Sequence, residues 1–118
     1  MPQITVDYSD RLADDFDRPG FAQALHAAAF EIAAAKPAAC KTQFRRTEET
    51  TVGPDTDGHA VVHVVLALAP GRTPGTKARL TTAVVDLLRR YVKPAGGLAL
   101  HLSAEVRDLD ASYRKFEA

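Results

Sequence analysis

The sequence has one cysteine, Cys40, in 118 residues, so it cannot form an internal disulfide. A chain without disulfides fits a reducing compartment, and we expect a cytoplasmic protein. The chain also lacks a basic and apolar leader at its start, and its longest apolar run, residues 60–69, is interrupted by His63. That run is far shorter than the ~20 residues of a membrane-spanning helix, so we expect no membrane association.

The sequence also has no excess of charge, because 15 Lys and Arg balance 15 Asp and Glu. Without a clustered basic stripe, nucleic acid is not an expected partner. The charge is nevertheless distributed unevenly along the chain. Residues 1–59 carry six basic and ten acidic side chains, whereas residues 60–118 carry nine basic and five acidic side chains. The local positive charge of the second half suits a small carboxylate ligand. The length and the 46% apolar content predict one domain with its own core.

Apolar periodicity predicts an α/β fold of two strand–helix–strand units. Phe21, Leu25, Ala28 and Ile32 have helical spacing, and Leu80, Val84, Leu87, Leu88 and Tyr91 form a second apolar stripe. Alternating or continuous apolar residues predict strands, and Pro and Gly mark the ends of the elements. The predicted strands are 3–8, 40–51, 59–69 and 98–107, and the predicted helices follow Pro19 and Pro74. The single domain, 1–118, therefore contains two pseudo-repeats, 1–52 and 59–108, joined by a turn at 53–58.

Right-handed crossovers would place both helices on one face of a four-stranded mixed sheet. The other face would then lack a cover in a monomer. The 59–69 run is nearly continuous in Val and Leu, which is typical of a strand covered on both faces. We therefore expect the chain to self-associate.

Several kinds of site are not expected. His59 and His63 lie four apart in a strand-like segment, about 13 Å along a strand, which is too far to share a metal ion. No motif activates a serine nucleophile, and Cys40 shows no sign of activation. The acidic residues Asp14, Asp15 and Asp17 are more typical of a solvated loop than of a catalytic group.

Pro2 is the first candidate catalytic residue. If Met1 is removed, which is usual before a small residue, the chain begins with a secondary amine. In an apolar pocket with cations nearby, the pKa of such an amine falls toward neutrality. It could then accept and return a proton as a general base.

Arg72 is the second candidate. It lies in Pro-Gly-Arg-Thr-Pro, directly before the predicted second helix, with Thr73 as a possible cap and Pro74 in the first turn. A guanidinium beside a helix N-terminus can bind a carboxylate through two hydrogen bonds. A solvated turn arginine would give the same sequence, and both interpretations stay open on this motif alone.

Several short strings, taken together, resemble the tautomerase superfamily, and most closely its 5-carboxymethyl-2-hydroxymuconate delta-isomerase family. They share the family's order and spacing over nearly the whole chain. The strings are Met1-Pro2, Ser9-Asp10, Asp17-x-Pro-Gly20, Val62-His63, Gly71-Arg72-Thr73 and Ser103-x-Glu-Val-x-x-Leu109.

The resemblance implies a homotrimer without cofactor or metal that isomerises an unsaturated di- or tricarboxylic acid in homoprotocatechuate breakdown. Pro2 would move the proton, and Arg72 would bind a carboxylate and stabilise the dienolate. The family's other arginine falls at Lys41, which keeps the charge but loses the two-pronged hydrogen bonding. Arg45, on the same strand face, is a candidate replacement.

Two alternatives remain at this level. The substitution at Lys41 allows a tautomerase relative recruited to another enolisable acid. A chain that keeps Met1 would have a blocked proline nitrogen and could be a non-catalytic trimeric binding protein.

Overall fold

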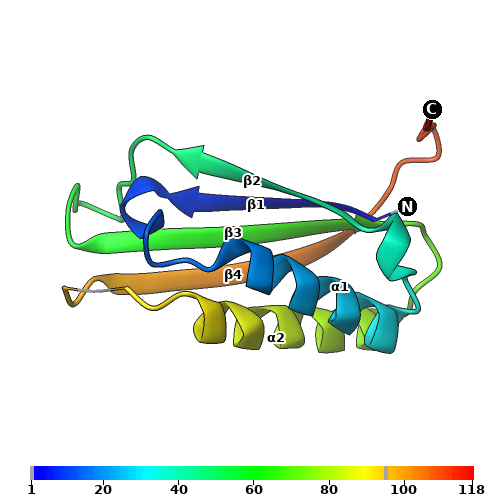
Figure 1. The fold of residues 1–118 in the computed structure, drawn as a ribbon, viewed down its shortest axis with the longest axis horizontal. Coiled ribbons are helices and arrows are strands. Elements are labelled where there is room, and N and C mark those ends of the chain that lie inside the picture. The colour runs from blue at the N-terminus through cyan, green and yellow to red at the C-terminus, as the bar shows by residue number, and fades with distance from the viewer. Residues whose placement is uncertain (1, 95) are drawn as a thin grey trace.

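The computed structural model describes residues 2–94 and 96–118 (Figure 1); Met1, whose removal the sequence leads us to expect, lies outside the described residues. Four strands, two α-helices and two short 3₁₀ helices follow one another along the chain. In order they are β1 (Gln3–Ser9), η1 (Asp10–Leu12), α1 (Arg18–Ala33), η2 (Pro37–Ala39), β2 (Lys41–Thr47), β3 (His59–Leu68), α2 (Pro74–Tyr91) and β4 (Ala99–Asp108).

The strands form one mixed sheet in the order β2-β1-β3-β4. β1 is parallel to β2, β3 is parallel to β4, and the two central strands β1 and β3 are antiparallel. Each parallel pair is joined through one helix, and both helices lie side by side on the same face of the sheet (Figure 1). The predicted β-α-β arrangement with a four-stranded mixed sheet is therefore confirmed.

Both helices begin where the sequence offers a capping side chain and a proline. The carboxylate of Asp17 accepts a hydrogen bond from the amide of Gly20 over 3.1 Å at the start of α1. The hydroxyl of Thr73 accepts from the amide of Thr76 over 3.1 Å at the start of α2. These bonds satisfy amides that have no partner within the helix, so each helix has a defined first turn.

The core lies between the sheet and the two helices. Alternate residues of β1 and β3 point into it, because side chains of a strand alternate between faces. Each helix contributes one apolar stripe. In α2 the buried residues belong to the predicted stripe, whereas in α1 Ala29 and Ala33 are buried in place of the predicted Ala28 and Ile32, which are half-buried. The fully buried larger side chains are Ile4, Val6, Leu12, Phe21, Leu25, Val62, Val64, Leu66, Leu68, Leu80, Val84 and Leu88.

Burial alternates along β3, so one of its faces lacks a cover in the single chain, as expected for a monomer; the cover of its second face by another chain stays a prediction. This uncovered face carries histidines as well as valines. His59 Nδ1 lies 2.9 Å from His101 Nε2, and His63 Nε2 lies 2.8 Å from a carboxylate oxygen of Glu105. These side chains lie on the sheet face opposite the helices, which we call the open sheet face.

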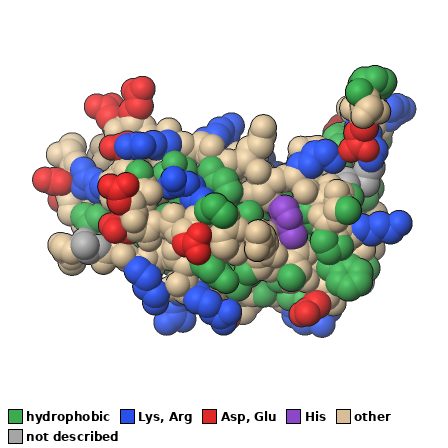
Figure 2. Space-filling view, in the orientation of Figure 1, with side chains coloured by type: hydrophobic (Ala, Val, Ile, Leu, Met, Phe, Trp, Pro, Cys, Tyr) green, Lys and Arg blue, Asp and Glu red, His purple; other side chains and the backbone are tan. Residues whose placement is uncertain are grey.

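Charged side chains of both signs are interspersed over the helix-covered side of the molecule (Figure 2). This mixed surface accords with the zero net charge of the chain. Within residues 2–94 and 96–118, no helix has the length and apolar character needed to cross a membrane.

Candidate active site

A cavity of about 280 Å³ opens at the end of the molecule where β1 begins. It is near the lower end of the volumes typical of small-molecule sites, about 300 Å³. Its wall is mostly apolar because four alanines contribute to it. The residues that line it are Pro2, Ala34, Ala35, Lys36, Ala39, Ala69 and Arg72.

Pro2 is buried and directly precedes β1. Its carbonyl oxygen accepts a hydrogen bond from the amide of Lys41 over 3.1 Å, which ties it to the start of β2. On the other side, Gln3 lies opposite Ala67 in the antiparallel register of β1 and β3. The beginning of β1 therefore meets the end of β3, and this register brings Pro2 and Arg72 to one cavity.

Arg72 is half-buried between the end of β3 and the start of α2. Its Nε donates to the carbonyl oxygen of Ala33 over 2.9 Å, and its Nη1 donates to the carbonyl oxygen of Ala69 over 3.0 Å. Among the described residues, Nη2 has no protein partner. The guanidinium is therefore held by the backbone and keeps donors for a ligand.

Lys41 and Arg45 do not line this cavity. Lys41 Nζ lies 3.0 Å from a carboxylate oxygen of Glu117 in the C-terminal tail. Arg45 lies opposite Asp7 in the register of β1 and β2 and makes two hydrogen bonds with its carboxylate, of 2.7 and 3.0 Å. In one chain, these two of the three predicted carboxylate-binding cations are thus paired with acidic side chains.

Lys36 is a cavity residue that no motif of the sequence indicates. It follows Ala34, which has the left-handed backbone angles φ 57° and ψ 28° at the end of α1. Non-glycine residues adopt this conformation rarely, so no pattern in an alanine-rich segment indicates it. Ala34, Ala35 and Lys36 all line the cavity, so this turn forms part of its wall.

Cys40 is buried next to this segment, and its thiol donates to the carbonyl oxygen of Lys36 over 3.5 Å. Burial raises the pKa of the Cys40 thiol, which keeps it protonated and unreactive at neutral pH. Cys40 therefore supports the wall of the cavity, and its thiol does not act as a nucleophile.

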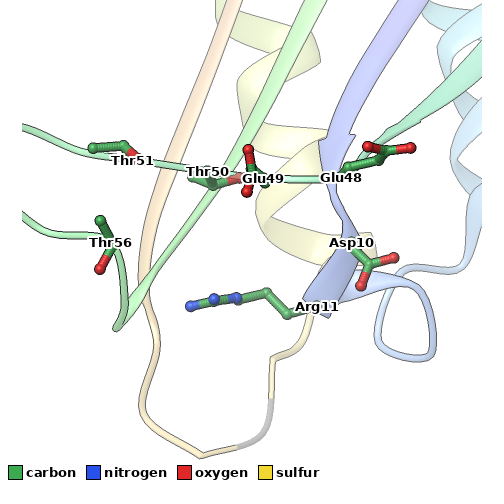
Figure 3. Close-up of a pocket in the computed structure, with 7 residues that line it drawn as sticks. All are labelled: Asp10, Arg11, Glu48, Glu49, Thr50, Thr51 and Thr56. Atoms are coloured by element: carbon green, nitrogen blue, oxygen red, sulfur yellow. The ribbon is translucent and has the colours of Figure 1, made fainter.

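A second cavity, of about 340 Å³, lies where β1 and β2 end (Figure 3). Three of the residues that line it, Asp10, Glu48 and Glu49, are acidic, and one, Arg11, is basic. Arg11 is itself paired with Asp57 over 3.0 Å. The carboxylates would repel an anionic ligand, so the Pro2 cavity is the better site for a carboxylic acid.

The histidines of β3 belong to separate networks. His59 also contacts a carboxylate oxygen of Asp55 at 3.0 Å, whereas His63 contacts the hydroxyl of Ser103 at 2.6 Å. No group of three or more His, Cys, Asp or Glu side chains in residues 2–94 and 96–118 is arranged to hold a metal ion.

Two β-α-β units in one sheet, with a proline and an arginine at one end of it, define a tautomerase-like fold. Solved structures share this fold at low sequence identity. A 5-carboxymethyl-2-hydroxymuconate isomerase from Deinococcus radiodurans R1 is 21% identical, with a TM-score of 0.77, over 98% of this chain and 90% of that chain. A 5-carboxymethyl-2-hydroxymuconate delta-isomerase is 13% identical, with a TM-score of 0.80, over 100% and 89% of the two chains.

A third similar structure is described as a fused 4-OT wild type symmetric trimer; it is 18% identical, with a TM-score of 0.72, over 91% of this chain and 85% of that chain. No curated protein sequence matches the chain. The model of the 5-carboxymethyl-2-hydroxymuconate isomerase family matches residues 2–117. The chain belongs to this family. It is a tautomerase-superfamily isomerase, and the family's reaction fits the catabolism of aromatic compounds.

Proposed function

We propose that the Pro2 cavity is the active site of the isomerase and that the free amine of Pro2, after removal of Met1, moves the proton. The observation that carries this proposal is that Pro2 and Arg72 line the same small, mostly apolar cavity. A desolvated amine near a guanidinium is disfavoured in its protonated form, so more of it is available as a base.

The proton moves between two ends of a conjugated system. The Pro2 amine takes the proton of the 2-hydroxyl group, and the O–H electron pair becomes part of the new C=O bond. The double bonds shift, and carbon 5 receives the proton from the amine. The 2-hydroxy-diene thereby becomes a 2-oxo-3-ene with no change in composition or oxidation level, and Pro2 returns to its starting state.

Arg72 binds the end of the substrate that carries the hydroxyl group. Its free Nη2 donates to the carboxylate beside carbon 2 and to the oxygen on which negative charge develops. Because the two backbone carbonyls already fix the guanidinium, little reorganisation is needed when the charge appears.

The assembly is proposed to be a homotrimer in which the open sheet faces surround the three-fold axis. The similar fold described as a symmetric trimer supports this arrangement. In such a trimer, Lys41 or Arg45 of one chain could leave its acidic partner and bind the substrate in the active site of a neighbouring chain. The cytoplasmic location expected from the single cysteine stays a prediction.

The test is the rate of ketonisation of 5-carboxymethyl-2-hydroxymuconate, followed by the ultraviolet absorbance of the dienol. Mass spectrometry first establishes that Met1 has been removed. Pro2→Ala and Arg72→Ala are expected to lower kcat/KM by about 10²–10⁴-fold. Asp14→Ala, in the exposed loop before α1, is the control and keeps the wild-type rate. An unchanged rate of ketonisation by the Pro2→Ala variant would contradict the proposal.

A further inference from the structure

Lys36 is the second cation of the Pro2 cavity, and its ammonium group has no acidic partner. The side chain is exposed at the cavity, and no hydrogen bond or ion pair to its Nζ is present among residues 2–94 and 96–118. Lys41 and Arg45, two of the three cations predicted from the sequence, differ in this respect, because Lys41 contacts Glu117 and Arg45 contacts Asp7. In the chain itself, Lys36 is thus the lysine that is free to bind a substrate anion at Pro2.

The backbone of Lys36 is held although its ammonium group is free. The carbonyl oxygen of Lys36 accepts a hydrogen bond from the amide of Ala39 over 3.0 Å and one from the Cys40 thiol over 3.5 Å. The next residue, Pro37, begins η2 and restricts the chain further. The stem of the side chain therefore starts from a defined point beside the cavity, and its flexible tetramethylene chain can follow the ligand.

The family's substrate needs more positive charge than Arg72 supplies. The compound 5-carboxymethyl-2-hydroxymuconate carries three carboxylates, two at the ends of the muconate chain and one on the carboxymethyl branch. Arg72 already donates hydrogen bonds from Nε and Nη1 to two backbone carbonyl oxygens. Carboxylates that enter a mostly apolar cavity without a cation would lose hydration without compensation.

We propose that Lys36 binds the carboxymethyl carboxylate of the substrate and so selects tricarboxylic over dicarboxylic dienols. This inference rests on the proposed role of Pro2. If Arg72 binds the hydroxyl end, Pro2 must reach carbon 5, which is the carbon that carries the carboxymethyl branch. The remaining cation beside Pro2 then faces that branch, and an exposed lysine suits a group near the cavity mouth.

The experiment compares two substrates, 5-carboxymethyl-2-hydroxymuconate and 2-hydroxymuconate, which lacks the carboxymethyl branch. Lys36→Gln is expected to raise KM for the tricarboxylic substrate by at least about tenfold, as the loss of a charge-assisted hydrogen bond would, with a smaller change in kcat. Its kinetics with 2-hydroxymuconate should stay within about twofold of wild type. Lys36→Arg keeps the charge and is expected to restore most of the tricarboxylate affinity.

Lys93→Gln is the matched control, because Lys93 is an exposed lysine just beyond the C-terminal end of α2 and does not line the cavity. It should leave both substrates unaffected. Equal losses for the two substrates in Lys36→Gln, or no loss for either, would overturn the inference. If Pro2→Ala is inactive while Lys36→Gln resembles wild type, the proposed function stands and only the role of Lys36 fails. If Pro2→Ala is fully active, the proposed function fails first, and the inference fails with it.

Discussion

Arg72 Nε donates to the carbonyl oxygen of Ala33 over 2.9 Å, so the arginine before α2 is fixed to the last turn of α1. The bond joins the two β-α-β units at the cavity that contains Pro2. A second bond, from Nη1 to Ala69, holds the same guanidinium to the end of β3. The fold therefore sets the orientation of Arg72 before a ligand binds.

Arg72→Lys is predicted to be almost as damaging as Arg72→Ala. A lysine keeps the positive charge, but a single ammonium group cannot bond both carbonyls from the same positions and also present donors to a substrate. We expect kcat/KM to fall by about 10²–10³-fold, measured by dienol absorbance. Arg79→Lys, an exposed change on α2, is the control and should retain the wild-type value. A fully active Arg72→Lys enzyme would show that charge alone is required.

Much of the fold could be predicted because its signals are local. Proline marks the start of both helices, Thr73 marks the cap of α2, and alternation marks β4; the capping of α1 by Asp17, which was expected in a solvated loop, was not predicted. The sequence does not show what covers the second face of β3, because Val61 and Val65 on the open sheet face are as apolar as their buried neighbours Val62 and Val64. A continuous run of valines does not distinguish one covered face from two.

Only the part of the candidate site that lies at the ends of strands could be predicted. Pro2 precedes the first strand and Arg72 follows the third, and antiparallel pairing brings these two ends together. Lys36 depends on the left-handed backbone of Ala34, for which an alanine gives no signal. The ion pair between Lys41 and Glu117 joins β2 to the chain's tail, a distant contact that no local pattern indicates.

The matched variants Gly20→Ala and Gly75→Ala are predicted to have opposite effects on stability. A methyl group at Gly20 would come too close to the carboxylate of Asp17 and to the ring of Tyr91, so we expect a loss of about 1–3 kcal/mol. At Gly75 the nearest atom is the Thr73 hydroxyl oxygen at 3.9 Å, and alanine there should add about 0.4–1 kcal/mol. Urea unfolding of the two variants measures both effects. Equal destabilisation by the two changes would contradict the predicted crowding at the start of α1.

Ser9 is predicted to be important for stability because its side chain is a buried link between strands. Ser9 is 1% exposed, and its hydroxyl oxygen accepts from the amide of Val61 over 2.8 Å and lies 2.7 Å from the hydroxyl of Thr50. Ser9→Ala leaves the Val61 amide without its partner and should cost about 1–3 kcal/mol in the free energy of unfolding. Thr50→Val removes only the other contact, so its cost should be smaller. A Ser9→Ala protein as stable as wild type would mean that the amide finds another acceptor.

His26 is predicted to make stability depend on pH. Its Nε2 lies 2.7 Å from the hydroxyl of Thr42, and burial lowers the pKa of His26 below its usual 6.5. The unfolded chain therefore binds the proton more readily than the folded chain. This stabilising contribution is complete above the unfolded pKa and is lost as pH falls through the lower, folded pKa.

The measurement for His26 is the urea midpoint at about pH 7.5 and at about pH 5.5, on either side of the unfolded pKa of histidine. In wild type the midpoint should be lower at the acidic pH. His26→Gln keeps a side chain that can hydrogen-bond Thr42 but removes the titrating group, so its midpoint should fall less between the two conditions. An equal fall in both proteins would assign the pH dependence to groups other than His26.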